Sequence, residues 1–575
     1  MLIIFILSIY FLYGLHYRFF YSYLRISSYK KKKILEKDYT KDRYSLRKIP
    51  KKIDIIVIGS GMGGLTAAGL LSKFGKKVLV LEQHYIAGGT THSFIDKGIE
   101  HETGLHYVGN IKKRKKILDL ITYNPIHWCK MGWERGKYIY DEIIIGQKHY
   151  KFEAGEDNLI NYLLEKFPNT SKKSLHKYFD LVKKVGNMNT YFLSKIIPIK
   201  FLVKMISYFN WEYNYYCNTS AYQIVNEIFD NQELISVLFG QFGDYGQIPQ
   251  EVNFFTHASI VSHYLDGGWF PRGGTSNIAN EMCKNIYNYG GKVLVNKKVN
   301  EILILYNRVI GVIMENEDII YCDKVISGVG VNNTFKKLVK YPIYDKLLKN
   351  VSHSVQHLYC FIKLKGSPKY LNLKSSNYWI YPHGDYKKCI NDYYKNPLTT
   401  EMPLFMGFSC RKDDKWEEKY ENFSNAVILV PAKKEWFDNW DNKKCMKRGE
   451  DYNNLKTKLG ERMIQQSLLR FYPELKDKIL DINMATPLTT QHYLNSSNGE
   501  SYGLDMNSYR LTKAFDLKPR TDINGLFLTG QDICTLGVTG AMMSGVLTAN
   551  VVAGYGNIID IILGNNIVDD LHKIN

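Results

Sequence analysis

The chain has 575 residues, of which 45% are hydrophobic, and it carries a formal net charge of +20 at pH 7. A chain this long exceeds what one ordinary hydrophobic core supports, so we expect two interlocked domains or one large domain with insertions. No zinc-finger spacing, RNP-like strand or leucine zipper accompanies the positive charge, so we expect no nucleic-acid partner and favour a solvated surface with some attraction to anionic membrane.

The N-terminal segment is strongly apolar. Its first 24 residues, MLIIFILSIYFLYGLHYRFFYSYL, approach the length that a membrane-spanning helix needs. No basic segment precedes this run and no small-x-small cleavage site follows it, so an uncleaved anchor is favoured over a cleaved signal peptide. If residues 1–24 span a membrane, the basic run Lys30–Lys33 keeps the rest of the chain on the cytoplasmic side; if they lie in the interface, the orientation stays open. We interpret 25–52, a charged stretch containing Pro50, as a basic linker.

The strongest local signal follows Lys52, where IDIIVIGSGMGGLTAAGLLSKFGKKVLVLEQ predicts a buried strand, a glycine turn, a small-residue helix and a second strand. Gly59 permits the tight turn, Gly61 lets the backbone approach a pyrophosphate, and Gly64 lets the helix pack close to the strand. Gly63 lies in the same turn. The helix N-terminus offers free N–H groups and a positive dipole to phosphates. This segment therefore predicts a nucleotide-binding βαβ unit.

An acid and a second glycine loop follow this unit. Glu82 closes the second strand, where its carboxylate can accept hydrogen bonds from ribose hydroxyls. Directly after it, Gly88, Gly89 and Thr90 make another loop suited to close backbone approach. Ordinary NAD dehydrogenases do not require such a segment.

Two later stretches complete the pattern. The first predicts a helix followed by a β-meander that contains Val299, and its sequence is WFPRGGTSNIANEMCKNIYNYGGKVLVNKKVNEILILYNRVIGVIM. Near the C-terminus, GLFLTGQDICTLGVTGAMMSGVLTANVVAGY predicts a strand, a turn and a helix with a face of Gly, Ala and Ser. Gly530 and Asp532 lie in the turn, and Gly540 is expected to open the helix.

The spacing Glu-x(5)-Gly-Gly from Glu82 to Gly89 resembles the FAD-binding amine oxidase and phytoene desaturase superfamily. At finer resolution the chain after residue 24 resembles the retinol saturase family, with carotenoid isomerases as near relatives. Thr90 and Thr91 depart from that family's small or Cys residues, and 496–500 is more polar than expected. The stretches that carry the resemblance are VIGSGMGGLTAA, VLVLEQHYIAGGTTHSF, ETGLHYVG, YLDGGWFPRGGTSNIA, ATPLTTQHYL, SYGLDM and LTGQDICTLGVTGA.

The resemblance implies an α/β fold class, with an FAD-binding Rossmann-like domain of amine oxidase or phytoene desaturase type, an α+β substrate domain and the N-terminal hydrophobic segment. It implies three FAD-binding parts, 53–110, 265–345 and 491–575, which alternate with two substrate-domain parts, 111–264 and 346–490. Val299 would hold the adenine through backbone groups, and Asp532 would lie beside the ribityl chain. The C-terminal helix would direct its dipole at the flavin and stabilise the anionic reduced form. The implied FAD-binding residues are Gly59, Gly61, Gly63, Gly64, Glu82, Gly88, Gly89, Thr90, Val299, Gly530, Asp532 and Gly540.

The activity implied by the family is saturation of one double bond in a retinoid, of the type that converts all-trans-retinol to its 13,14-dihydro form, by hydride transfer from FAD. The alternatives are a redox-neutral carotenoid cis-trans isomerase or a carotenoid desaturase with the same flavin site, and a flavin-binding scaffold without turnover. The reduction needs an apolar tunnel and one proton donor. We single out no catalytic residue; the candidate donors are His106, Tyr107, His492, Tyr493 and Tyr502.

A second GxGxxG motif between a strand and a helix is absent from the sequence, so the electrons are expected from NAD(P)H visiting the flavin transiently or from a partner reductase. The expected partners are a retinoid or carotenoid substrate and membrane lipid, and the expected location is the endoplasmic reticulum membrane. His101, Glu102 and His106 do not have HExxH spacing, and the nine cysteines form no CxxC pair. We therefore expect no metal.

Overall fold

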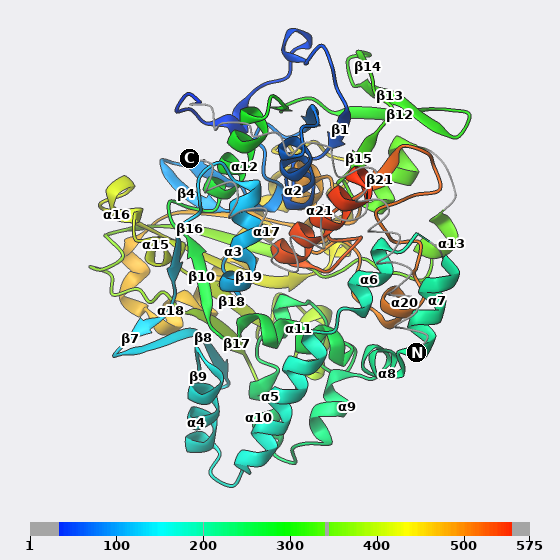
Figure 1. Ribbon diagram of the computed structural model, residues 1–575. Helices are drawn as coiled ribbons and strands as arrows, with labels where there is room; N and C mark the ends of the chain where they lie inside the picture. Colours follow the sequence, from blue (N-terminus) through cyan, green and yellow to red (C-terminus); the bar gives the residue numbers. More distant parts are fainter. Residues whose placement is uncertain (1–33, 199, 340–343, 555–575) are drawn as a thin grey trace, which may run out of the picture.

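The computed structural model describes residues 34–198, 200–339 and 344–554 (Figure 1). The predicted N-terminal anchor, residues 1–24, lies outside the described residues. Among the helices that are described, each is too short or too polar to cross a bilayer.

A five-stranded parallel sheet forms the centre of the nucleotide-binding half (Figure 1). Its strands come from three widely separated parts of the chain, and β1 lies in the middle because both β2 and β15 pair with it in parallel. In spatial order the strands are β11 (Lys292–Leu294), β2 (Val78–Leu81), β1 (Ile55–Ile58), β15 (Val325–Ser327) and β21 (Leu526–Leu528).

Both faces of this sheet are covered, which explains why its strands are apolar at every position. Ile55 and Val57 of β1 face one side and belong to a cluster that we call the helix-side core. Ile56 and Ile58 face the other side, where a three-stranded meander covers them. The helices on the first face are α2 (Met62–Lys73), α3 (Ile111–Ile121), α12 (Ser276–Asn288) and α21 (Gly537–Ala553), and the meander strands are β12 (Val299–Leu305), β13 (Arg308–Met314) and β14 (Ile319–Tyr321).

Helix α21 begins at Gly537, so the prediction that Gly540 opens this helix is wrong. Gly540 lies in the first turn, where a Cβ would come within 2.1 Å of the carbonyl oxygen of Thr535. The glycine is needed because the preceding turn folds back onto the helix. Further along, a Cβ on Gly545 would lie 2.5 Å from the oxygen of Gly63, so these glycines let α21 approach α2 closely.

Two predicted boundaries differ from the described structure. Within the predicted linker 25–52, the side chain of Tyr39 is 5% exposed in the helix-side core, and Arg43 forms a parallel bridge with Val295 beyond the end of β11. The linker therefore joins the nucleotide-binding half from Tyr39 onward. The predicted substrate-domain part 111–264 begins with α3, which packs in the same core through apolar side chains such as Ile121.

The second half is built on a mixed eight-stranded sheet that lies below the first sheet in Figure 1. Its longest strands pair antiparallel, whereas β17 and β8 run parallel. The strands are β20 (Ile479–Ala485), β16 (Gln356–Lys365), β19 (Phe423–Ala432), β18 (Leu404–Gly407), β17 (Asn377–Tyr381), β8 (Lys137–Ile145) and β7 (Trp133–Glu134), with β9 (Lys148–Glu153) paired to β8.

Helices of the middle segment cover the lower edge and part of the right side of the molecule (Figure 1). Most of them share one aromatic-rich core with the large sheet, to which Tyr178, Phe255 and Trp379 all belong. These helices are α4 (Glu156–Lys166), α5 (Lys172–Gly186), α6 (Thr190–Ile196), α7 (Lys200–Phe209), α8 (Trp211–Asn218), α9 (Ala221–Asn226), α10 (Gln232–Leu238), the short η4 (Phe242–Asp244) and α11 (Phe254–Tyr264).

The remaining strands and helices connect the two halves or pack on the large sheet. The connecting strands are β3 (Ser93–Asp96), β4 (Ile99–Glu102), β5 (Val108–Gly109), β6 (Trp128–Lys130) and β10 (Gly268–Pro271). The remaining helices are η1 (Tyr39–Lys41), η2 (Leu46–Lys48), η3 (Gly89–Thr91), η5 (Asn333–Leu338), α13 (Asp345–Leu348), α14 (Tyr386–Lys395), α15 (Ser409–Lys412), α16 (Trp416–Lys419), η7 (Lys434–Trp440), α17 (Glu450–Gln466), α18 (Leu468–Phe471), η8 (Pro473–Lys478), α19 (Pro487–Leu494) and α20 (Ser508–Thr512).

Candidate active site

A large cavity lies where the two halves meet. Its volume is about 1020 Å³, at the upper end of the range of about 300–1,000 Å³ found for small-molecule sites. One wall is made by the loops that follow the carboxyl ends of β1, β2, β15 and β21, the usual position of ligand sites in open parallel sheets. The opposite wall comes from the large sheet and from η4 and α11.

The glycine turn after β1 has the geometry that close approach to a ligand requires. Gly59 has a φ of +90°, and a Cβ on Gly64 would lie 2.2 Å from the oxygen of Gly59, so helix and strand meet backbone to backbone. A Cβ on Gly61 would meet no atom within 4 Å. Gly61 lines the cavity and is the N-cap of α2, so the free N–H groups of this helix start at an open surface.

Glu82 follows β2 and is held in place from both carboxylate oxygens. Oε2 accepts hydrogen bonds from the backbone N and the Oγ of Ser60, each at 2.8 Å, and Oε1 accepts one from the N of His84 at 2.8 Å. Ser60 Oγ in turn accepts from the N of Gly88 at 3.1 Å. Ser60 therefore joins the two glycine loops, a role that the sequence pattern did not indicate.

The second glycine loop packs directly on the first. Gly88 and Gly89 both have positive φ, at 129° and 56°, and a Cβ on Gly89 would lie 2.9 Å from the Cα of Gly61. Gly89, Thr90 and Val299 line the cavity, the last at the start of β12. The predicted site residues Gly64, Gly88 and Gly540 are not among the lining residues.

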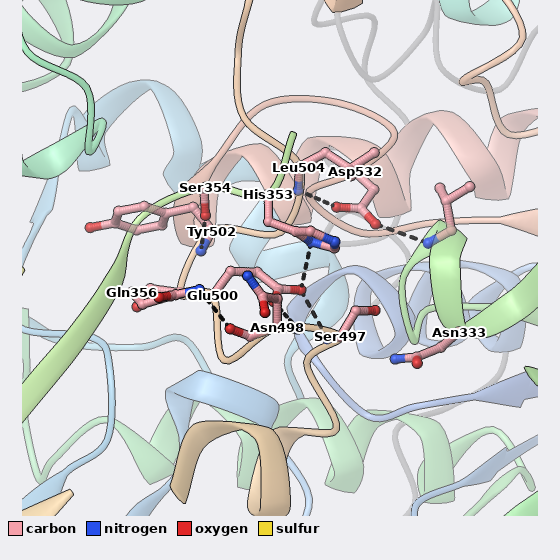
Figure 2. A network of polar contacts seen from close by, with 12 residues as sticks. Asn333, His353, Ser354, Gln356, Ser497, Asn498, Glu500, Tyr502, Leu504 and Asp532 are labelled. Carbon is pink, nitrogen blue, oxygen red and sulfur yellow. Dashed lines mark hydrogen bonds and ion pairs between the residues drawn. The ribbon is translucent and has the colours of Figure 1, made fainter. Parts of the chain in front are cut away.

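Asp532 lies in the cavity wall, but its carboxylate also connects two chain segments (Figure 2). Oδ2 accepts a hydrogen bond from the N of Val331, and Oδ1 accepts one from the N of Leu504, both at 2.9 Å. Gly503 approaches so closely that a Cβ there would lie 2.2 Å from Oδ1. Asp532 therefore fixes the loop after β15 and the segment before α20 at the same wall.

A polar network holds the segment 495–504 against the start of β16 (Figure 2). Glu500 accepts hydrogen bonds from the N of Ser497 at 3.1 Å and of Asn498 at 2.6 Å. Its carboxylate also forms an ion pair with His353 Nδ1 at 3.5 Å, and this partner raises the pKa of His353. Gln356 Nε2 donates to the oxygen of Asn498 at 2.8 Å. This network was not predicted, because its two sides are about 150 residues apart in sequence.

Four of the five candidate proton donors line the cavity: His106, Tyr107, Tyr493 and Tyr502. His492 is not among the lining residues, although it lies in α19 beside Tyr493. The Nε2 atom of His106 is buried without a hydrogen-bond partner, and burial lowers the pKa of this imidazole to about 3, so it is neutral at pH 7. Burial raises the pKa of Tyr107 and of Tyr502, which makes both phenols weaker acids.

Behind Tyr107 lies a buried polar cluster that the sequence analysis did not include. The Tyr107 hydroxyl lies 3.0 Å from Asp141 Oδ2 and 2.7 Å from Asp244 Oδ2. Asp141 also accepts hydrogen bonds from Gln241 and Asn377. Of these residues, Tyr107 and Asp244 line the cavity. An acid inside the aromatic stretch QFGDYG was the available signal for Asp244.

The remaining wall of the cavity is largely aromatic. It includes Tyr264 from α11, Trp379 from β17, Phe405 from β18, and Tyr359 and Phe361 from β16. Tyr264 stacks on Tyr107, with ring centroids 4.3 Å apart. A flat, apolar ligand fits such a wall, whereas a charged one does not.

Comparisons with known sequences show which proteins this chain is similar to. A family model described as an NAD(P)-binding Rossmann-like domain matches residues 57–123. The chain is 34% identical over 550 residues to the all-trans-retinol 13,14-reductase of Danio rerio, covering 90% of this chain and 88% of that protein. The enzyme of that name from Rattus norvegicus is also 34% identical, over 544 residues and with the same coverage. Prolycopene isomerase 1 of an Oncidium hybrid cultivar is 24% identical, covering 88% of this chain and 84% of that protein.

Solved structures show the same fold at low sequence identity. Putrescine oxidase bound to putrescine has a TM-score of 0.57 at 14% identity, covering 86% of this chain and 98% of that chain. Cyclohexylamine oxidase of Brevibacterium oxydans has a TM-score of 0.56 at 13% identity, covering 87% and 98%. The predicted α/β fold with a Rossmann-like domain is therefore confirmed.

The His353–Glu500 ion pair predicts a pH-dependent contribution to stability. Because the pKa of His353 is raised by folding, its contribution is complete below the pKa of the unfolded chain and is lost as pH rises through the raised value. A partly exposed ion pair contributes at most about 1 kcal/mol. We expect His353→Gln to lower the thermal midpoint at acidic pH and to have little effect at alkaline pH. A difference between the two proteins that grows with pH would contradict this assignment.

Proposed function

Because the chain belongs to the all-trans-retinol 13,14-reductase family, we propose that it is an FAD-dependent oxidoreductase that saturates one double bond of a retinoid, as in the conversion of all-trans-retinol to its 13,14-dihydro form. The observation that carries this proposal is the shared cavity. The glycine turn after β1 and the second glycine loop, which we together call the glycine cradle, suit a dinucleotide. They border the same space as the aromatic wall, which suits a flat apolar substrate.

The residues at the cavity fit FAD. Gly61 leaves room for a pyrophosphate at the N-terminus of α2, and Ser60 and His84 hold Glu82 at the cavity, where its carboxylate would accept hydrogen bonds from a ribose. Val299 would hold the adenine, and Asp532 with the start of α21 would border the ribityl chain and the ring. When bound, FAD supplies two-electron transfer as hydride.

The protein's own contribution is to hold the polyene and keep water away from it. The aromatic side chains of β16, β17 and β18 offer a flat apolar surface, and the neutral imidazole of His106 adds no charge to it. A conjugated substrate placed there would lie between this surface and the loops that border the flavin site. The carbon that receives no hydride must still receive a proton from a nearby acid or from water.

The electron source is part of the same proposal. We expect reduction either by NAD(P)H that visits the flavin transiently or by a partner reductase. Anaerobic mixing of the flavin-loaded protein with NADPH separates these routes, because bleaching of the flavin absorbance would mark direct reduction.

We propose that the protein works at a membrane, with the endoplasmic reticulum as the expected location. A retinoid is nearly insoluble in water and would enter from lipid. Four aromatic residues support this proposal, because α7 and the start of α8 expose them together: Phe201 (67% exposed), Tyr208 (80%), Phe209 (56%) and Trp211 (73%). Exposed aromatics grouped on adjacent short helices are typical of an interfacial surface.

The glycine cradle generates a prediction about cofactor binding. Gly61 has an ordinary φ of −63°, and a Cβ there meets open space, so Gly61→Val should fold normally. We expect it to weaken FAD binding at least tenfold, or by about 1.4 kcal/mol, because the side chain occupies the place of the pyrophosphate. Flavin absorbance per polypeptide and the thermal midpoint of the apoprotein measure both effects. As a contrast, Gly64→Ala should lower that midpoint, since its Cβ collides with Gly59. A Gly61→Val protein that retains full flavin would contradict the proposal that the pyrophosphate binds at Gly61.

Product mass tests the reaction. The flavin-loaded protein, reduced anaerobically with dithionite, is mixed with all-trans-retinol, and we expect a product two hydrogens heavier together with recovery of the oxidised flavin spectrum. Carotenoid isomerase relatives make redox-neutral isomerisation the alternative, which would leave the mass unchanged. A desaturase would instead lower the mass of its substrate and require oxidised flavin. An unchanged retinol pool with flavin still reduced would overturn the proposed activity.

Vesicle binding tests the membrane surface. We expect the double variant Phe201→Ser with Trp211→Ser to bind phosphatidylserine vesicles at least tenfold more weakly than the unaltered protein, with flavin content unchanged, because two apolar anchors are lost. Tyr306→Ser is the matched control, since Tyr306 is 94% exposed in the turn between β12 and β13. Equal binding by all three proteins would rule out α7 and α8 as the contact surface.

A further inference from the structure

We propose that Asp244 is the catalytic acid of the reduction and gives the proton of its carboxyl group to the substrate carbon that receives no hydride. This inference rests on the proposed function and names a residue for its second half-step. Asp244 ends the short helix η4 and lines the cavity together with Phe242 and Gly243.

Asp244 lines the same cavity as the start of α21, which would border the flavin. The lining residues there include Leu536, immediately before α21, and Gly537, its first residue. The stacked rings of Tyr107 and Tyr264 line the same cavity.

Counting protons at Tyr107 indicates that one of its two acidic neighbours is protonated. The phenol has one hydroxyl proton, yet its oxygen lies within hydrogen-bonding distance of both Asp141 and Asp244, at 3.0 and 2.7 Å. Both contacts are hydrogen bonds only if one carboxyl group donates to the phenol oxygen. Two ionised carboxylates at one buried phenol would also repel each other.

The other hydrogen bonds place that proton on Asp244. Asp141 is fully buried and accepts from Asn377 at 2.8 Å and from Gln241 at 2.6 Å in addition to Tyr107, an environment that favours the carboxylate. Among the described residues, Tyr107 is the hydrogen-bond partner recorded for the Asp244 carboxyl group. A carboxyl group with one such partner gains least from being ionised.

Charge balance leads to the same assignment. Lys412 is a buried cation linked to this cluster, because its ammonium contacts Asn377 Oδ1 and donates to the oxygen of His106 at 3.0 Å. One buried ammonium balances one carboxylate, and Asp141 is the first of the charges that act on it. Glu102 needs no counter-ion in the neutral form, because burial raises its pKa to about 8. Asp244 is then left neutral.

Burial and the neighbouring Asp141 raise the pKa of Asp244 well above its ordinary value. Burial also raises the pKa of Asp141, but four side chains that interact with its carboxylate act in the opposite direction. The other cavity candidates are poorer donors at neutral pH. The pKa values of Tyr107 and Tyr502 are raised, and the lowered pKa of His106 leaves it without its second proton.

The step balances as follows. Two C–H bonds form across one double bond of the substrate: one hydrogen arrives as hydride with both electrons from the reduced flavin, and the other arrives as the proton of Asp244. The carboxyl O–H bond breaks, the flavin ends oxidised, and Asp244 ends as a carboxylate. Tyr107 then donates its hydrogen bond to that carboxylate until solvent restores the proton.

Infrared spectroscopy of the flavin-loaded protein tests the protonation state without turnover. We expect the wild-type minus Asp244→Asn difference spectrum at pH 7 to contain the carbonyl stretching band of a protonated carboxylic acid. Asp230→Asn, at an exposed position outside the cavity, is the matched control and should leave no such band. In Asp141→Asn, the Asp244 band should titrate away at lower pH than in the wild type, because the neighbouring negative charge is gone. A wild-type minus Asp244→Asn difference spectrum that lacks this band would overturn the proposal.

Rapid mixing of the dithionite-reduced protein with all-trans-retinol tests the proton transfer. We expect Asp244→Asn to bind FAD normally and to slow flavin reoxidation and product formation at least about 100-fold, the lower range for general acid catalysis. Asp244→Glu should retain part of the rate, and the wild-type rate should fall as pH rises through the pKa of Asp244. An Asp244→Asn protein that reduces retinol at the wild-type rate would overturn the inference.

The two experiments separate failure of this inference from failure of the proposed function. If wild-type protein converts no retinol, the proposed activity is wrong, and the infrared difference spectrum still decides whether Asp244 carries a proton. If wild-type protein and Asp244→Asn convert retinol equally, the activity stands and the assignment of the acid falls.

Discussion

The architecture depends on the contact between the start of α2 and the end of β1. There the oxygen of Gly59 lies where any side chain on Gly64 would have to be, so the helix can only begin so close to the strand with glycine at that position. The same contact directs the free N–H groups of α2 into the cavity. Gly89 packs on Gly61 and Gly545 packs on Gly63, so the second glycine loop and α21 both pack against this same turn and helix start. The two glycine loops, the central sheet and the C-terminal helix therefore all depend on this one contact.

Sequence reasoning predicts backbone geometry best where the residues lie close together in the chain. The turn at Gly59, Gly61 and Gly64, the acid at Glu82 and the loop at Gly88 and Gly89 lie within about 30 residues, and each residue type follows from backbone geometry. The fold could also be predicted, because the family resemblance covers most of the chain. The start of α21 was misplaced because two glycines, Gly537 and Gly540, stand close together and only the chain path shows which one precedes the helix.

Sites assembled from distant segments could not be predicted in this way. Asp141 comes from β8 and Asp244 from η4, and nothing in either local sequence indicates that both approach Tyr107. The pairing of His353 with Glu500 is hidden for the same reason. Burial decides the chemistry of these groups, and burial is a property of the folded chain. The sequence predicts Asp532 as a cofactor neighbour, whereas its hydrogen bonds with Val331 and Leu504 are visible only in the fold.

The order of strands in the parallel sheet has a consequence for biosynthesis. Its central strand is made several hundred residues before β21 and α21. Until then the outer edge of β15 and the face of α2 that packs on α21 have no partner, so the nascent chain exposes apolar surface that chaperones would have to shield. A ligand that binds the completed fold but not the incomplete chain would stabilise the native state. The supply of cofactor would therefore influence how much folded protein accumulates.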